Sequence, residues 1–255
     1  MKVSNIPRKM LFLSIIFVFL SQSAFALNEY EKKGFDLLET SSVVSVEQIK
    51  SIVTKAKSKN ASFNFSALAE GSGWSMLMTA IYYGASFDVV KYLVDGGANL
   101  QFQTADGYTA LVILASGYTP SKPMTVGDAA QKFIYIADRK GVTKIEKPKL
   151  LRTAVQHKQL GIVKYLVESK QANVNTRDEK GCTPLMYAML FPSQLGGGKT
   201  YDLVVYLVET AKADVTAKDN QGNTVISYIK DKFFPMAWDM DDYKKAGDYL
   251  KLKVR

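Results

Sequence analysis

The sequence is poor in the residues that most catalytic and cross-linked sites need. It has a single cysteine, Cys182, so no disulfide can form within the chain and stability must come from packing. Pairing of Cys182 with a second chain is open, but we favour a small residue in a turn. The single histidine, His157, stands between Gln156 and Lys158. Because triads and most zinc sites need histidine with suitable neighbours, we interpret His157 as a surface residue of a turn.

Motifs for other chemistry are incomplete. Residues 196–200 resemble the end of a phosphate-binding loop, but the Walker pattern requires a glycine where Ser193 stands and a strand before the loop. Asp239, Asp241 and Asp242 could hold a cation, yet acidic residues at a helix start interact favourably with the helix dipole without a metal. There is no dinucleotide fingerprint and no nucleic-acid-binding motif. We therefore predict no enzyme activity, no cofactor, no metal and no nucleic-acid partner.

The one long apolar run lies at the N-terminus. Basic residues precede an apolar run at residues 10–20, and residues 24–26 have the small-x-small form that signal peptidase cuts. The alternative is a retained membrane anchor, but the run is well short of the ~20 residues that a span needs. We predict a signal peptide cleaved after Ala26, a periplasmic or extracellular protein, and no stable membrane anchor after cleavage. Loss of three basic residues would lower the full-chain charge of +9 to +6, which favours solubility.

The stretch 178–188 predicts a tight turn followed by the start of a helix. Gly181 suits the turn because glycine adopts positive φ freely. Thr183 can cap the helix with its hydroxyl, and Pro184 suits the first helical position, where its missing N–H is not needed. Leu185 begins a buried stripe. Weaker copies of this stretch recur along the chain, so we expect a repeat protein.

Two series of anchor residues keep step along the sequence. The anchors of the first helices are Leu77, Leu111, Leu151, Leu185 and Ile226, and those of the second helices are Tyr92, Tyr135, Tyr165, Tyr206 and Tyr249. A period near ~33 residues with insertions fits both series. Since one helix pair is too small to bury its own apolar face, stacking of the next pair must supply the core.

These segments resemble the ankyrin repeat family. The resemblance is carried by residues 106–111 and 181–188, by the segments 90–94, 163–167 and 204–208, and by the closing segments 98–99, 172–175 and 213–215. It implies an all-α solenoid of stacked helix-turn-helix repeats with short hairpin loops and helical caps. The histidine that the family has after its leucine is Met78, Val112, Arg152 or Met186 here, and its Gly-His between the helices is missing. We therefore expect a less regular and less stable stack.

The predicted organisation has three parts after the signal peptide, which covers residues 1–26. Residues 27–69 form an N-terminal helical cap, with one helix at about 30–38 and a second that follows Ser45 as N-cap, with Gln48 completing a capping box. The repeats cover about 70–103, 104–147, 148–177 and 178–217. Residues 218–255 form a C-terminal capping repeat with a polar last helix near 241–251.

Three repeats carry an enlarged loop between their two helices, at residues 117–124, 191–198 and 233–238. Each loop combines proline with aromatic or methionine side chains, which suit an interface when exposed. The alternatives are that these loops fold back over the helix ends, or that the partner binds hairpin tips and first helices, where Trp74 and Tyr82 could equally be core residues. The candidate partner-binding residues are Tyr118, Met124, Phe191, Leu195, Phe234, Trp238, Tyr108, Arg177 and Lys180.

The resemblance implies a non-enzymatic scaffold whose partner is another protein. Exported proteins of this kind resemble bacterial periplasmic or secreted factors, so the partner could be an enzyme or toxin that this chain protects against or inhibits, as an immunity protein does. A second hypothesis is a secreted effector that binds a host protein. A third is an enzyme whose site lies in the enlarged loops.

Overall fold

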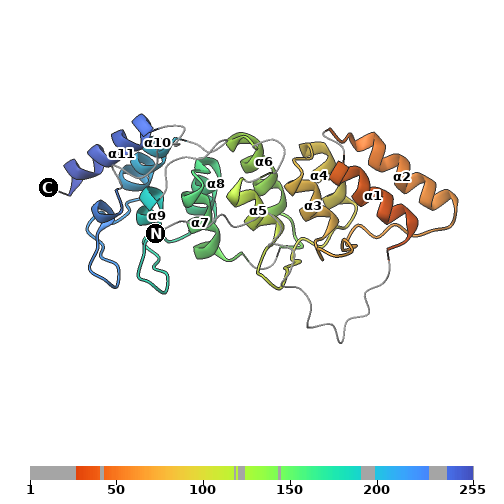
Figure 1. Ribbon diagram of the computed structural model, residues 1–255, viewed down its shortest axis with the longest axis horizontal. Helices are drawn as coiled ribbons and strands as arrows, with labels where there is room; N and C mark the ends of the chain where they lie inside the picture. Colours follow the sequence, from red (N-terminus) through yellow and green to blue (C-terminus); the bar gives the residue numbers. More distant parts are fainter. Residues whose placement is uncertain are drawn as a thin grey trace, which may run out of the picture.

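The computed structural model describes residues 27–40, 43–117, 119, 124–142, 145–190, 199–229 and 240–254. In these ranges the chain is helical, and its only extended pairing is an isolated antiparallel bridge between Leu68 and Ser75. The helices stand side by side in one elongated row (Figure 1). The predicted all-α stack of helical hairpins is therefore confirmed. Within the described ranges, no helix has the length and apolar character needed to cross a membrane.

Successive helices form pairs along the row. The pairs are α1 (Glu29–Thr40) with α2 (Val46–Ser58), α3 (Met76–Tyr82) with α4 (Phe87–Asp95), α5 (Ala110–Ser116) with α6 (Val126–Ala137), α7 (Lys147–Gln156) with α8 (Leu160–Lys164), and α9 (Pro184–Leu190) with α10 (Thr200–Val205). Helices α8 and α10 continue as the π-helical turns η2 (Tyr165–Ser169) and η3 (Tyr206–Thr210). Helix α11 (Met240–Lys253) packs on α10 at the C-terminal end.

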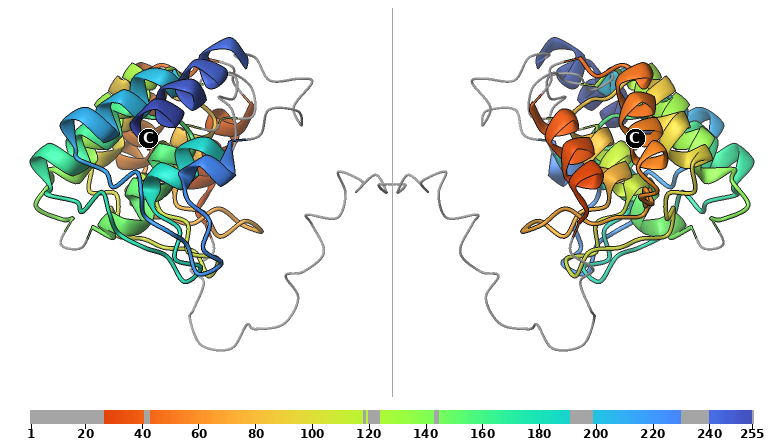
Figure 2. Two further views of the ribbon diagram at one scale, coloured as in Figure 1. Left: turned by 90° about the vertical axis from the view of Figure 1, so that its left-hand side faces the viewer. Right: turned by 90° about the vertical axis from the view of Figure 1, so that its right-hand side faces the viewer.

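The row has two layers of helices. The first helices α1, α3, α5, α7 and α9 contact one another in sequence, while α2, α4, α6 and α8 form the second layer. Viewed along the row, the helices lie on one side and the hairpin loops that connect the pairs extend to the other (Figure 2). We name this loop side the hairpin edge; it contains the tips at residues 70–75, 104–109, 178–183 and 219–224. One edge of the molecule is thus built from loops of successive repeats.

The leucine anchors form the core of the first layer. Leu77, Leu111, Leu151 and Leu185 are at most 4% exposed, and burying each leucine contributes about 1.5–3 kcal/mol. The last anchor, Ile226, is only partly buried, because the expected first helix of the final repeat is a single 3₁₀ turn, η4 (Val225–Tyr228). Adjacent β-branched residues disfavour a longer helix there. Val225, 1% exposed, occupies the core in its place.

The two helices of the N-terminal cap begin at capping boxes. The predicted box of α2 is confirmed, since Gln48 N–H donates to Ser45 Oγ and Ser45 N–H donates to Gln48 Oε1. Sequence reasoning missed the box of α1, where Asn28 Oδ1 accepts from Glu31 N–H and Glu31 Oε2 accepts from Asn28 N–H at 3.0 Å. Glu31 Oε1 also accepts from Asn64 N–H at 2.9 Å. This carboxylate ties α1 to the connector before the first repeat.

The second-helix tyrosines join neighbouring repeats. Four of the five tyrosine hydroxyls donate to a carboxylate near the end of the preceding second helix. The pairs are Tyr135 with Asp95, Tyr165 with Asp138, Tyr206 with Glu168, and Tyr249 with Glu209. We name this series the tyrosine ladder. It connects repeats by hydrogen bonds without the histidines of the family pattern.

The tyrosine ladder predicts a loss of stability when one hydroxyl is removed. Burial, together with the Glu168 carboxylate, raises the pKa of Tyr206, which is the signature of a hydroxyl held as a donor. Tyr206→Phe should lower the free energy of unfolding by about 1–2 kcal/mol in urea denaturation. Tyr201→Phe is the control, because no hydrogen bond of its hydroxyl occurs in the part of the chain described. An equal loss in both variants would show that the Tyr206 hydrogen bond of the tyrosine ladder does not stabilise the stack.

Candidate protein-docking face

The predicted binding loops are largely outside the described residues. This holds for Tyr118, Phe191, Leu195, Phe234 and Trp238, and also for the predicted cleavage site at Ala26. Met124 is described and is only 4% exposed, in contact with the hydrophobic core. Its thioether fills the core beside the start of α6 instead of facing solvent, contrary to the exposed position predicted for it.

The hairpin tips are tight turns that the local sequence specifies. The glycines at three tips, Gly107, Gly181 and Gly222, have positive φ values of 80°, 77° and 83°, a region that favours glycine. In two tips an aspartate Oδ1 accepts from the backbone N–H groups two and four residues later. These acceptors are Asp178 and Asp219, at distances of 2.8–3.0 Å. The tips are therefore ordered before any partner arrives.

The same aspartates attach the tips to the helices behind them. The hydroxyl nine residues later donates to Oδ2 at 2.7 Å, from Tyr187 to Asp178 and from Tyr228 to Asp219. The Tyr228 hydrogen bond, aided by Asn223, lowers the pKa of Asp219 to about 2. Burial opposes ionisation of Asp178, but hydrogen bonds from Tyr187 and the backbone leave its pKa below the ordinary value. Both carboxylates therefore serve the turn and remain ionised at neutral pH.

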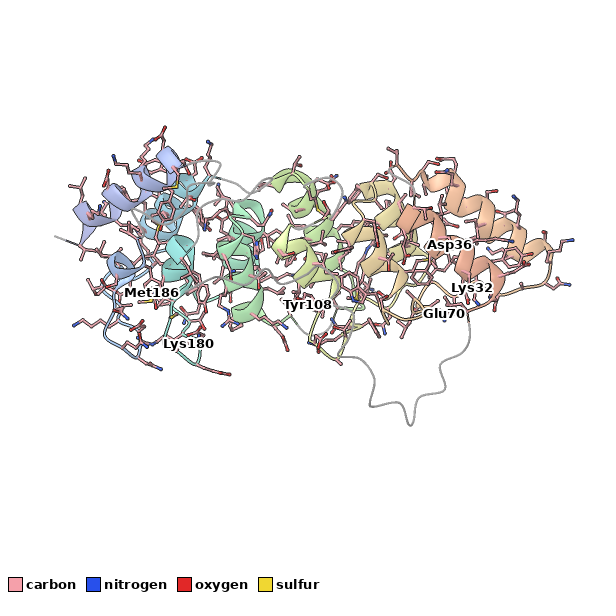
Figure 3. All side chains as sticks on the ribbon, in the orientation of Figure 1. Lys32, Asp36, Glu70, Tyr108, Lys180 and Met186 are labelled. Carbon is pink, nitrogen blue, oxygen red and sulfur yellow. The ribbon has the colours of Figure 1, made fainter. Side chains whose placement is uncertain are left out.

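Neighbouring tips also bind each other. Asn220 N–H donates to the Lys180 carbonyl oxygen at 3.0 Å, and its side-chain amide donates to the Glu179 carbonyl oxygen at 2.9 Å. The Arg177 guanidinium donates to the Lys218 carbonyl oxygen. Both predicted cationic candidates, Arg177 and Lys180, are exposed, but Arg177 also braces one tip against the next. Figure 3 shows Lys180 and Tyr108 on the same edge of the row.

An aromatic cluster lies in the N-terminal half of the hairpin edge. The Trp74 ring centroid is 5.0 Å from that of Tyr82 and 6.2 Å from that of Tyr108. Tyr108 is 47% exposed. Leu68 pairs across the isolated bridge with Ser75, the residue after Trp74, and is 40% exposed. Trp74 and Tyr82 are half-buried. From the sequence, Trp74 and Tyr82 could be either core or surface residues. The structure places them at the boundary, with part of each side chain facing solvent.

A buried lysine is the feature that sequence reasoning missed. Lys158 is 0% exposed and has a positive φ of 56°, in the turn between α7 and α8. Its ammonium donates to the Ala188 carbonyl oxygen of α9 at 2.7 Å, and burial lowers its pKa to about 7. The sequence did contain a signal for this feature. The glycine that the ankyrin repeat family has between its two helices is missing from the turn that contains Lys158. The neighbouring His157 ends α7 in the predicted turn but is half-buried, and this burial lowers its pKa.

The described residues offer no assembled metal site. Within them, no group of three or more His, Cys, Asp or Glu side chains is placed to hold a metal ion. Asp241 and Asp242 lie in the first turn of α11, where Asp242 accepts from the Tyr201 N–H at 3.1 Å. Thr200 is 1% exposed at the start of α10. Asp239 and residues 196–198 lie outside the described part of the chain.

Comparison with known proteins gives a family-model match over part of the chain and a similar fold. Residues 126–219 match the family model of ankyrin repeats in three copies. A similar solved structure is that of the Bd0816 predatory endopeptidase from Bdellovibrio bacteriovorus in complex with immunity protein Bd3460, matched with 19% identity over 87% of this chain and 98% of that chain at a TM-score of 0.57. Another is EF0377, an ankyrin repeat protein, with 18% identity over 87% and 96% at 0.57. No curated protein matches the sequence.

Proposed function

We propose that this ankyrin repeat protein is a non-enzymatic scaffold that binds another protein through its hairpin edge. The observation that carries the proposal is the aromatic cluster on an edge of ordered turns. Trp74 and Tyr108 present partly exposed rings on a surface whose backbone is already fixed by glycine turns and aspartate hydrogen bonds. Aromatic anchors dominate many protein interfaces, and a preorganised surface loses little conformational entropy on binding.

The partner in this proposal is an enzyme or toxin that the chain protects against or inhibits. The similarity to a structure in which an immunity protein is in complex with a predatory endopeptidase supports this choice. The signal-like N-terminus supports a periplasmic or extracellular meeting place for the two proteins. The chain acts by occupying its partner's surface and performs no chemistry of its own.

The proposal predicts which substitutions abolish binding. Trp74→Ala combined with Tyr108→Ala should weaken binding of the partner by at least about thirtyfold, because each aromatic anchor is expected to contribute a large share of the affinity. The partner is isolated with the purified wild-type protein from the fraction in which the protein occurs. Its affinity is then measured by calorimetry, and its hydrolytic activity is assayed with and without the bound chain.

A matched control lies on the opposite layer. Tyr201→Ala removes a ring of similar size that carries the Lys245 ammonium 3.9 Å from its centroid and is far along the row from Trp74. We expect this variant to bind and inhibit as wild type does. Equal binding by the Trp74/Tyr108 variant, or hydrolytic activity of the chain itself, would contradict the proposal. Recovery of the protein only from cytoplasm would contradict the proposed location.

A further inference from the structure

The tyrosines of the second-helix layer are covered by cations of this chain. Lys or Arg groups lie 4.0–5.8 Å from the ring centroids of Tyr92, Tyr135, Tyr165, Tyr206 and Tyr249. At such distances the positive charge is attracted by the face of the ring. On this layer the aromatic faces are thus already used within the molecule.

Two rings of the aromatic cluster differ in this respect. In the described part of the chain, no lysine or arginine lies over the face of Trp74 or of Tyr108, although tryptophan is the best ring for a cation. The ammonium of Lys149 lies at the tip that contains Tyr108, where it donates to the Gly107 carbonyl oxygen at 2.7 Å. That group is thus engaged by the backbone of the tip.

Carboxylates flank the aromatic cluster at both ends. Burial raises the pKa of Tyr83, and the charge of Glu39 in α1 adds to this effect. The Tyr83 ring lies 5.3 Å from that of Tyr82. At the other end, the exposed Asp106 stands two residues before Tyr108 in the same tip. Aromatic faces between carboxylates are complementary to a planar or compact cation.

The C-terminal half of the hairpin edge carries charges of both signs. Arg177, Glu179 and Lys180 are exposed there, and the ionised Asp178 and Asp219 hold their own turns through hydrogen bonds. Arg152 lies 3.7 Å from Asp178 and faces the Tyr187 ring at 5.6 Å. A basic side chain therefore meets resident cations in this half, whereas the rings of Trp74 and Tyr108 in the N-terminal half have no cation over their faces.

We infer that the aromatic cluster receives an arginine or lysine side chain of the partner protein, so that the partner's docking segment is basic where it meets α3 and α5. This inference rests on the proposed function for the existence of a protein partner and adds the chemistry of its contact. The basic side chain lies against Trp74 and Tyr108 and is neutralised by Asp106.

The test uses two peptide probes of equal length and opposite charge. Dye-labelled acetyl-hexaarginine amide and acetyl-hexaglutamate amide are titrated with the purified protein at low salt, and fluorescence anisotropy gives the affinities. Hexaarginine should bind more tightly than hexaglutamate. Because the chain has two tryptophans, Trp238→Phe leaves Trp74 as the sole reporter, whose emission should change saturably with hexaarginine.

The variants locate the binding site. Trp74→Leu and Tyr108→Leu should each weaken hexaarginine binding about fivefold or more, and Asp106→Asn about twofold to threefold. Tyr201→Leu, which removes a ring already covered by Lys245, should leave the affinity unchanged. Tyr108 is 47% exposed, so its variant should keep the fold even if the Trp74 variant does not. Unchanged affinity in Tyr108→Leu, or tighter binding of hexaglutamate, would overturn the inference.

The two proposals can fail separately. If wild type retains a protein partner that loses affinity for the Trp74→Ala/Tyr108→Ala variant but binds Asp106→Lys with undiminished affinity, the basic contact is wrong and the scaffold function stands. If hexaarginine binds the cluster as expected but wild type retains no protein from its own compartment, the scaffold function fails while the cation site stands.

Discussion

The native protein should become more stable between pH 7 and pH 9, and replacing Lys158 with methionine should abolish this rise. The Lys158 ammonium is buried between α7 and α9 and donates to the Ala188 carbonyl oxygen. Burial lowers its pKa from 10.5 to about 7. Methionine retains most of the side-chain volume but has no proton to release, so the variant lacks this source of pH dependence.

The direction of this pH dependence follows from the number of protons bound by the folded and by the unfolded chain. Between pH 7 and pH 10.5 the unfolded chain keeps the proton on Lys158, whereas the folded chain has largely lost it. Stability rises with pH wherever the unfolded state binds more protons. From pH 7 to pH 9 this term should add about 2 kcal/mol to the free energy of unfolding. Below pH 7 both states are protonated, and the term is constant.

Urea denaturation at intervals between pH 6 and pH 9 measures the difference between wild type and variant. The series stops at pH 9 because the tyrosines of the ladder begin to ionise in the unfolded chain near pH 10. Lys212→Met is the matched control, since Lys212 also has a positive φ, of 61°, but is exposed. The same slope in wild type and Lys158→Met would show that Lys158 does not titrate in the folded protein.

Leu151→Ala should give the largest loss of stability, about 3–4 kcal/mol, because it leaves a cavity in the middle of the row. Leu151 is 0% exposed on α7, and α7 packs on both α5 and α9. In a stack, each repeat is stabilised mainly by its immediate neighbours. The cavity should therefore weaken α5, α7 and α9 much more than α1.

Hydrogen exchange followed by mass spectrometry tests this expectation helix by helix. Protection should fall in α5 to α9 and persist in α1 and α2. Leu252→Ala is the control, because Leu252 is 68% exposed on α11 and should change the free energy of unfolding by less than about 0.5 kcal/mol. A uniform loss of protection from α1 to α11 would indicate a single cooperative globule and would contradict a nearest-neighbour stack.

The sequence predicted the features of the fold that depend on local chemistry. Thr183, Pro184 and Ser45 mark helix starts through capping and φ preference, and all three stand where the structure begins α9 or α2. The leucine anchors predicted the stack because one helix pair cannot bury them alone. The short turn η4 was missed because a helix-start signal does not determine how far the helix continues.

Features that depend on contacts between repeats could not be predicted in the same way. Tyr206 and Glu168 are 38 residues apart, so their pairing depends on the register of two stacked repeats. Lys158 lies in a polar segment that reads as exposed, and only the approach of α9 buries it. Met124 follows a proline-containing loop, and the core position it fills is created by neighbouring helices.

The aromatic cluster depends both on local sequence and on contacts between repeats. Tyr108 was a candidate because it stands in a hairpin tip. Its closeness to Trp74, at 6.2 Å between ring centroids, joins tips of two different repeats. The sequence therefore identified the members of the surface but not the surface itself. The structural use of Asp178 and Asp219 became visible only when their hydrogen bonds to Tyr187 and Tyr228 were seen.

We propose above all that the tyrosine ladder engages the second-helix side of the stack within the molecule, while the hairpin edge remains available to a protein partner. The most direct measurement is hydrogen exchange of the chain alone and in complex with the partner captured from its own compartment. Binding should slow exchange at residues 67–75 and 104–109 and leave the second helices α4, α6 and α8 unchanged. Slowed exchange confined to those second helices, with residues 67–75 and 104–109 unaffected, would contradict the account.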